Sequence, residues 1–167
     1  VVDRGLSAIV ANIDHKIADL SDREQSDERD ETLALYRAIR LECRASVAMA
    51  NRYADRAEQL ADLAPTARRR EELLKIAGVC RSVPEFPART FHEAVQSFWF
   101  VHYAFFSTGT KLSCGRIDQY LHPSLKADLD TGRITLSEAQ ELIDSLWLRF
   151  NDRAQICREN FFIPAGK

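Results

Sequence analysis

Residues 89–120 read RTFHEAVQSFWFVHYAFFSTGTKLSCGRIDQY, and this stretch decides the fold. It holds seven of the thirteen Phe and Tyr residues and one of the two tryptophans. Thr90 and Glu93 match the S/T-x-x-E capping box, in which the hydroxyl accepts the third amide and the glutamate reaches back to the capping residue's own amide. We therefore expect a helix that begins at Phe91. Beyond Ala94 almost every position is apolar or aromatic, so this helix should be buried on most sides.

A short loop and a second helix follow the aromatic helix. Gly109 ends the helix, and residues 110–114 form a loop before Gly115. Arg116 and Asp118 then open the next helix, where we expect them to form a structural ion pair rather than to act in catalysis. A buried helix that leads into a shaped loop is thus the simplest interpretation of the whole stretch.

Composition indicates one globular domain that does not bind polyanions. The chain has 167 residues, 46% hydrophobic and 29% charged, which is typical of a folded soluble protein. A net charge of −2 gives no long-range attraction for nucleic acid or anionic lipid. The basic run Arg68–Arg70 is followed at once by Glu71 and Glu72, which is typical of a solvated helix face. We expect no nucleic-acid partner and no membrane partner.

The sequence predicts neither a membrane span nor a metal site. No apolar run approaches the roughly 18 residues that a span needs, and no signal segment is seen, so the protein is expected to be cytoplasmic. The four cysteines lie far apart without a C-x-x-C pair, and three sit in apolar helical contexts that suit a small core residue. His92 and His102 lie on the aromatic helix, where we expect hydrogen-bonded structural histidines rather than catalytic ones or metal ligands.

Apolar residues spaced by three or four positions predict further helices. Pro65 and the extended linker at residues 83–87 separate them, Pro123 should interrupt the helix in which it lies, and a second capping box, Thr135 to Glu138, starts the last one. The expected helices cover residues 6–20, 67–81 and 116–129, and two more begin at residues 91 and 136. A further long helix carries its apolar stripe at residues 36–61. The buried positions should be Tyr36, Ile39, Cys43, Val47, Ala50, Ala54, Ala57 and Ala61; Leu73, Leu74, Ala77 and Cys80; and Ala139, Leu142, Ile143, Leu146, Trp147 and Phe150. No strand pattern or repeat is found, so the fold class is all-α with about six helices in one segment, 1–167.

Several segments of this chain resemble a known family. Residues 87–100 read PARTFHEAVQSFWF, residues 115–123 read GRIDQYLHP, and residues 135–151 read TLSEAQELIDSLWLRFN. In order and spacing these strongly resemble consecutive segments of the glycyl-radical enzymes, and most closely the dehydratase and lyase branch of the pyruvate formate-lyase-like family. Residues 73–84, LLKIAGVCRSVP, resemble the helix that precedes them. The resemblance is strongest over residues 50–155.

The resemblance implies an internal fragment of a larger enzyme in which such helices surround a ten-stranded β/α barrel. The family stores a radical on a glycine in an Arg-Val-x-Gly-Tyr-type loop and passes it to a cysteine in a second loop. None of the six glycines here lies in such a context, and Cys114 and Cys157 do not match the cysteine loop. We therefore expect no catalytic residue and no bound cofactor in this chain, and the glycyl radical only in the full-length enzyme.

The loop departs from the pattern of the dehydratase-like members. They commonly carry Asn-Gly-His-Ser-x-Ser before the Gly-Arg-x-Asp step, whereas residues 108–113 here read TGTKLS. Thr110 and Lys111 thus replace the His-Ser pair that lies near the substrate in some members, which puts glycerol-type dehydration in doubt. If Lys111 points inward, an anionic substrate such as a carboxylate or sulfonate would offset the cost of burying its ammonium group. The alternative is that Lys111 faces solvent or pairs with Asp118 or another acid.

Two functions therefore stay open at the level of sequence. In the first, the chain is a piece of a glycyl-radical lyase or dehydratase that cleaves a C–O, C–N, C–S or C–C bond of a small polar or anionic substrate and is inactive alone. The resemblance then implies anaerobic conditions, an iron–sulfur activating enzyme that uses S-adenosylmethionine, and commonly a homodimer. In the second, the chain is a non-catalytic all-α interaction module.

Overall fold

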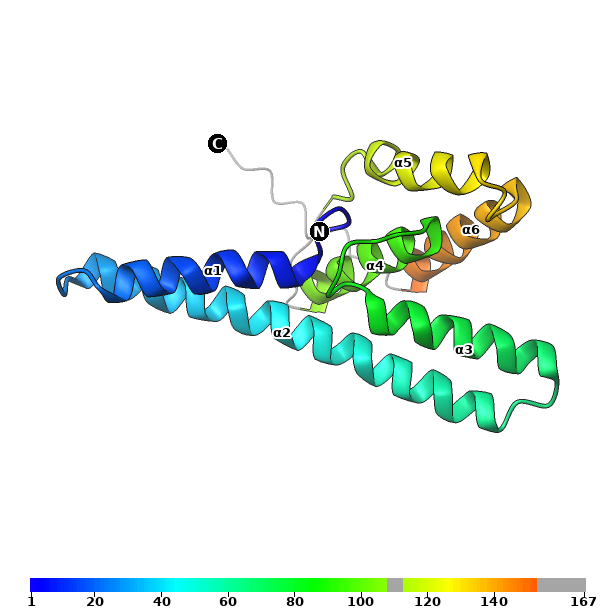
Figure 1. The fold of residues 1–167 in the computed structure, drawn as a ribbon, viewed down its shortest axis with the longest axis horizontal. Coiled ribbons are helices and arrows are strands. Elements are labelled where there is room, and N and C mark those ends of the chain that lie inside the picture. The colour runs from blue at the N-terminus through cyan, green and yellow to red at the C-terminus, as the bar shows by residue number, and fades with distance from the viewer. Residues whose placement is uncertain (108–112, 153–167) are drawn as a thin grey trace, which may run out of the picture.

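The computed structural model describes residues 1–107 and 113–152. Over these residues the fold consists of helices and connecting turns without a β-strand, which confirms the all-α prediction. Figure 1 shows α1 antiparallel to one half of the long α2, α3 folded back along its other half, and α4 in the middle with α5 and α6 beyond it. The helices are α1 (Gly5–Ser21), α2 (Asp27–Asp62), α3 (Ala67–Ser82), α4 (Phe91–Ser107), α5 (Ile117–Asp130) and α6 (Leu136–Asp152).

Side chains at the helix starts explain where α2 and α3 begin. The hydroxyl of Ser26 accepts a hydrogen bond of 3.2 Å from the amide of Arg29. The hydroxyl of Thr66 accepts one of the same length from the amide of Arg69. Such caps satisfy amides that have no partner within the helix. Because the cap of α2 lies at Ser26, the helix starts at Asp27, nine residues before Tyr36, the first residue of the apolar stripe that predicted it.

Small residues let α2 and α3 approach closely. Ala50, Ala54, Ala57 and Ala61 of α2 are all buried, as the stripe predicted. The first three form one core cluster with Ala77 and Cys80 of α3 and Phe100 of α4. An alanine exposes no bulky side chain, so the backbones of two helices come together where alanine recurs every three or four residues. This half of α2 therefore carries the α2–α3–α4 core.

In the other half of α2 the stripe prediction was confirmed for Cys43, which is buried, and was wrong for Ile39. Ile39 is 39% exposed, whereas Leu33 and Ser46 are buried. Among the described helices, α1 is the one that lies along this half of α2 (Figure 1), and Arg40 of α2 donates to Asp14 of α1 at 2.8 Å. One covering helix buries a narrower strip than two do, so the stripe extends past the contact.

Two further burial predictions were wrong because a neighbouring helix covers only part of each face. Leu74 of α3 is 40% exposed, and Val79 is buried instead. Trp147 of α6 is 54% exposed, although Ala139 and Leu146 of the same helix are buried. The α4 prediction also fails towards its C-terminal end, where Phe105 is 48% exposed and most other side chains are half-buried.

Pro123 lies inside α5 and does not interrupt it, contrary to the prediction. A proline in a helix removes one amide donor and crowds the preceding turn. The helix continues on both sides of Pro123, and Leu121, two residues earlier, is buried in the core cluster. The helix ends at Asp130, and Gly132, two residues later, has a φ of 66° in the left-handed region.

Backbone hydrogen bonds tie the start of α1 to the linker between α3 and α4. Leu6 N–H donates to the Pro84 carbonyl at 2.8 Å, and Ser7 N–H donates to the Glu85 carbonyl at 2.9 Å. Gly5 makes this approach possible because its φ is 71° and a Cβ at this position would lie 2.3 Å from the Glu85 oxygen. A residue with a side chain fits neither the conformation nor the space.

Candidate functional site

Helix α4 is the element that leads into the predicted substrate loop, and its first turn is held by a capping box. Glu93 N–H donates to the Thr90 hydroxyl at 3.1 Å, as predicted. The Glu93 carboxylate, however, accepts the amide of Arg89 at 2.7 Å rather than that of Thr90. It reaches one residue further back because the Arg89 guanidinium also binds it, with a 3.0 Å ion pair.

The Glu93 carboxylate is ionised although it is buried. Its side chain is only 8% exposed. Burial alone would raise its pKa, but the hydrogen bonds from the Arg89 side chain and backbone outweigh this and hold the pKa below its ordinary value. Arg89 also donates to the Ser82 hydroxyl at 3.2 Å, so this one side chain links the end of α3 to the start of α4.

Asp128 holds the same end of α4 from the opposite side. Its carboxylate, 3% exposed, accepts the amide of Phe91 at 2.7 Å and forms an ion pair with Arg133. A carboxylate at a helix N-terminus satisfies a free amide and interacts favourably with the helix dipole. The sequence analysis missed Asp128 because its partner Phe91 is 37 residues away. The only local signal for a role of Asp128 was Arg133, a possible ion-pair partner five positions later, just after Gly132.

An aromatic cluster surrounds the second half of α4. The ring of Phe150 from α6 lies 4.9 Å from that of His102 and 5.8 Å from that of Trp99, both edge-on. The ring of Phe98 lies 5.7 Å from that of Tyr120 of α5. These rings join α4, α5 and α6 into a wall that positions the C-terminal end of α4.

The histidines of α4 are neutral at physiological pH. Burial lowers the pKa of His102, which lies among aromatic rings. Burial and the nearby Lys75 lower the pKa of His92. His102 packs against aromatic rings, and the hydrogen-bonded structural role expected for both histidines stays a prediction. Over the described residues no group of three or more possible ligands comes close enough to hold a metal ion.

The residues that follow the loop are anchored to α5. The Tyr120 hydroxyl donates to the Cys114 carbonyl at 2.9 Å, and burial raises the pKa of Tyr120 to about 12, so the proton stays in place. Arg116 and Asp118 form the predicted ion pair at 2.7 Å on the exposed surface. The predicted substrate-contacting residues Thr110 and Lys111 lie outside the described residues, so their role stays a prediction.

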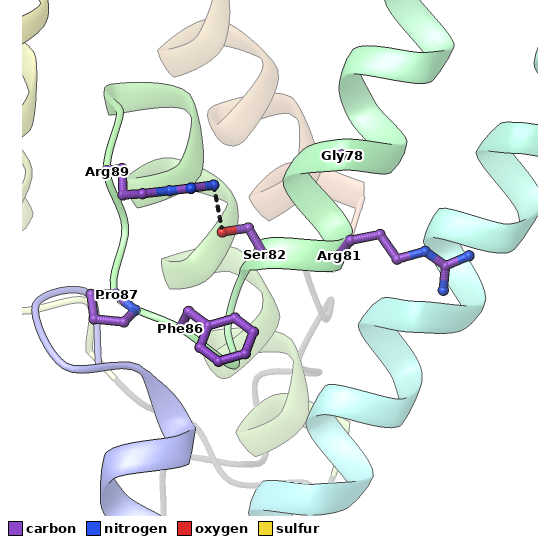
Figure 2. Close-up of a pocket in the computed structure, with 6 residues that line it drawn as sticks. All are labelled: Gly78, Arg81, Ser82, Phe86, Pro87 and Arg89. Atoms are coloured by element: carbon purple, nitrogen blue, oxygen red, sulfur yellow. Dashed lines mark hydrogen bonds between the residues drawn. The ribbon is translucent and has the colours of Figure 1, made fainter.

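A shallow hollow of about 450 Å³ lies between α3, the linker and the start of α4. Figure 2 shows the Arg89 side chain crossing it towards Ser82, whereas Arg81 points away towards α2. Arg81 is bound by Asp55 at 2.5 Å and Glu58 at 3.0 Å, and Arg89 is bound by Glu93. Both guanidinium groups are thus paired with carboxylates of the chain, and the described residues that line the hollow offer no unpaired positive charge with which to hold an anion.

Comparison with known proteins identifies the family. A model of the pyruvate formate lyase-like family matches residues 1–161. The chain belongs to this family. The family relatives include the isethionate sulfite-lyase of Nitratidesulfovibrio vulgaris, which is 40% identical over 153 residues. The alignment covers 89% of this chain and 18% of the relative.

Solved structures of family members share the fold. A chain from a structure on 1,2-propanediol dehydration in Roseburia inulinivorans is 37% identical to this chain, with a TM-score of 0.84. The match covers 94% of this chain and 19% of that chain. A glycyl radical enzyme from Archaeoglobus fulgidus is 36% identical with a TM-score of 0.82, at 89% and 19% coverage. The chain thus spans about one fifth of the length of these proteins. The predicted family and helical fold are confirmed.

No helix of the described residues is both long and apolar enough to cross a membrane.

The exposed large apolar residues of α4 and α6 distinguish between the two functions considered from the sequence, the enzyme segment and the independent helical module. An independent helical module would have to cover its own aromatic helix, yet Phe105 and Trp147 are about half exposed. This favours a segment that is completed by further polypeptide.

Proposed function

We propose that this segment is the helical part of a larger glycyl-radical lyase or dehydratase that cleaves a C–O, C–N, C–S or C–C bond of a small polar or anionic substrate. The observation that carries the proposal is the simultaneous match of sequence and backbone over nearly the whole chain to enzymes of this kind. The loops that carry the radical glycine and the reactive cysteine have no counterpart in residues 1–167. The segment is therefore inactive alone and serves to shape the site.

In this proposal Thr110 and Lys111 contact the substrate. The isethionate sulfite-lyase acts on a sulfonate, and a lysine ammonium offers such an anion a charged partner and three donors. Asp118, the acid considered as an alternative partner of Lys111, is already bound by Arg116 through two hydrogen bonds of 3.0 and 2.7 Å. That pairing supports the substrate contact, because it leaves Asp118 less able to hold Lys111.

The proposal includes the partners that such an enzyme needs. The radical is generated by an iron–sulfur activating enzyme that uses S-adenosylmethionine, under anaerobic conditions, and the complete enzyme is a homodimer in the cytoplasm. None of the described residues would hold the radical, so the contribution of this chain is positional. The capping carboxylates Glu93 and Asp128 fix one end of α4, and the aromatic wall fixes the other.

A chimera tests the proposal. Residues 1–152 replace the matching segment of the isethionate sulfite-lyase, and the purified protein is activated anaerobically. The proposal predicts a glycyl-radical signal in electron paramagnetic resonance and measurable bond cleavage with a small polar or anionic substrate. The 167-residue chain alone should give neither. A folded chimera that carries the radical and turns over none of a panel of such substrates would refute the proposal.

Lys111→Met in the same chimera tests the substrate contact. The variant keeps most of the length of the side chain but removes its charge, so KM for an anionic substrate should rise about tenfold or more, as expected for the loss of a charge-assisted hydrogen bond. Lys126→Met is the matched control, because Lys126 is exposed on α5 and pairs with Asp130 at 2.5 Å. An unchanged KM for Lys111→Met would remove the contact from the account.

A further inference from the structure

One tyrosine holds the backbone just after the predicted substrate contacts. The Tyr120 hydroxyl, in the first turn of α5, donates to the backbone carbonyl of Cys114 at 2.9 Å. Cys114 lies three positions after Lys111 in the sequence. Burial raises the pKa of Tyr120 to about 12, so the hydroxyl keeps its proton and stays a donor at physiological pH. The bond therefore fixes a backbone atom near Lys111 along the chain.

The ring of Tyr120 is itself held by the core. It packs against the cluster that contains Phe91 and Leu121, and it lies 5.7 Å from the ring of Phe98 of α4. A tyrosine has only two side-chain torsions, so a packed ring sets the position of its hydroxyl. The Cys114 carbonyl is thus tied to the core between α4 and α5.

The neighbouring contacts are local and do not reach the core. The amide of Gly115 donates to the hydroxyl of Ser113 at 3.2 Å. Arg116 binds Asp118 through two hydrogen bonds of 3.0 and 2.7 Å. These contacts shape the turn before α5, whereas the Tyr120 hydroxyl sets the position of that turn relative to the core.

We infer that Tyr120 is a positioning residue for substrate binding, because its hydroxyl holds the backbone that follows Lys111 where the ammonium group meets the anionic part of the substrate. This inference rests on the proposed function, in which Lys111 contacts the substrate. In this role Tyr120 acts through the backbone rather than by touching the substrate. Its effect on affinity must therefore depend on the charge at residue 111, whereas a merely structural hydroxyl would act in the same way with or without that charge.

Tyr120→Phe removes the hydroxyl and keeps the ring. In the chimera with the isethionate sulfite-lyase, before activation, it should weaken the binding of isethionate about two- to tenfold in a ligand-observed NMR titration, as expected for the loss of one neutral hydrogen bond. In the Lys111→Met background the same substitution should change the affinity by less than about twofold. Tyr53→Phe is the matched control, because the 52% exposed Tyr53 also packs on α4, 5.9 Å from the ring of Phe100. It should leave the affinity unchanged.

Alkylation of Cys114 gives a second measurement that needs no substrate. Its side chain is half-buried, so releasing its backbone in Tyr120→Phe should raise its rate of reaction with iodoacetamide several-fold, as followed by peptide mass spectrometry. The rates of Cys43 and Cys80, which are buried, should not change, because the fold stays intact. Tyr53→Phe should alter none of the three.

The outcomes separate this inference from its basis. An unchanged rate for Cys114, or the same loss of affinity with and without Lys111, would overturn the positioning role even in an active chimera. The inference also fails if the chimera does not bind isethionate. A faster Cys114 together with a loss of affinity that depends on Lys111, in a chimera that carries the radical but shows no turnover, would support the positioning role and refute only the proposed reaction.

Discussion

Replacing Gly5 by alanine should detach the start of α1 from the linker between α3 and α4. The new Cβ would lie 2.3 Å from the Glu85 oxygen and 2.6 Å from the Phe86 carbonyl carbon, both of which are backbone atoms that cannot rotate away. The φ of 71° is also unfavourable for a residue with a side chain. The backbone of one segment must therefore move.

The cost has two parts that can be separated. The left-handed conformation costs about 1–2 kcal/mol. Displacing the backbone also weakens the hydrogen bonds from Leu6 and Ser7, of 2.8 and 2.9 Å, each worth about 0.5–1.5 kcal/mol. Alanine restricts the unfolded chain and returns about 0.4–1 kcal/mol. We expect a net loss of about 2–4 kcal/mol in the free energy of unfolding.

Gly132→Ala is the matched control. Its φ is 66°, yet a Cβ there would meet nothing within 4 Å, so only the conformational part should be lost. Urea unfolding of the 167-residue chain, followed by circular dichroism, gives both values. Gly5→Ala should be the more destabilising by at least about 1 kcal/mol, the worth of the weakened hydrogen bonds. Equal losses for the two variants would refute the argument from the close backbone contact.

Three further predictions concern buried polar groups in α4 or bound to it. Asp128→Ala should lower the free energy of unfolding by about 1–3 kcal/mol because it leaves the Phe91 amide unpaired, and Asp128→Asn should lose less; equal values would contradict the capping role. Glu93 has a lowered pKa when folded, so its stabilisation is complete above about pH 4.5 and is lost as the pH falls further, and in acid unfolding the advantage of the wild type over Glu93→Gln should shrink over that range. Ser97→Ala should be neutral or stabilising in thermal unfolding, because its buried hydroxyl has no partner among the described residues, whereas Ser82→Ala should destabilise by losing the bond from Arg89. A clear loss for Ser97→Ala would show that its hydroxyl is bonded.

Features fixed by neighbouring residues could be predicted from the sequence. The capping boxes at Thr90 and Thr135 fix the starts of α4 and α6, because each needs only residues three positions apart. The ion pair of Arg116 with Asp118 follows from the same local reasoning. The alanine stripe of α2 was also confirmed, since alanines three or four positions apart lie on one face of a helix.

Features that depend on distant residues could not be predicted. The exposure of Ile39 and Trp147 depends on which helix lies over them, and the pairing of Asp128 with Phe91 depends on the turn between α5 and α6. Glu93 accepts from Arg89 because the linker brings that guanidinium close. Thr110 and Lys111 were predicted by resemblance alone, so their contact with a substrate needs the chimera described above.

The central claim is that this segment belongs to an enzyme that carries a glycyl radical. It is tested most directly by electron paramagnetic resonance of the complete product of the gene that encodes these residues, after anaerobic incubation with an activating enzyme that uses S-adenosylmethionine. The account predicts a doublet signal from a backbone glycyl radical, which disappears when the radical glycine is replaced by alanine. A complete gene product that shows no such signal, under conditions in which a known glycyl radical enzyme does, would contradict it.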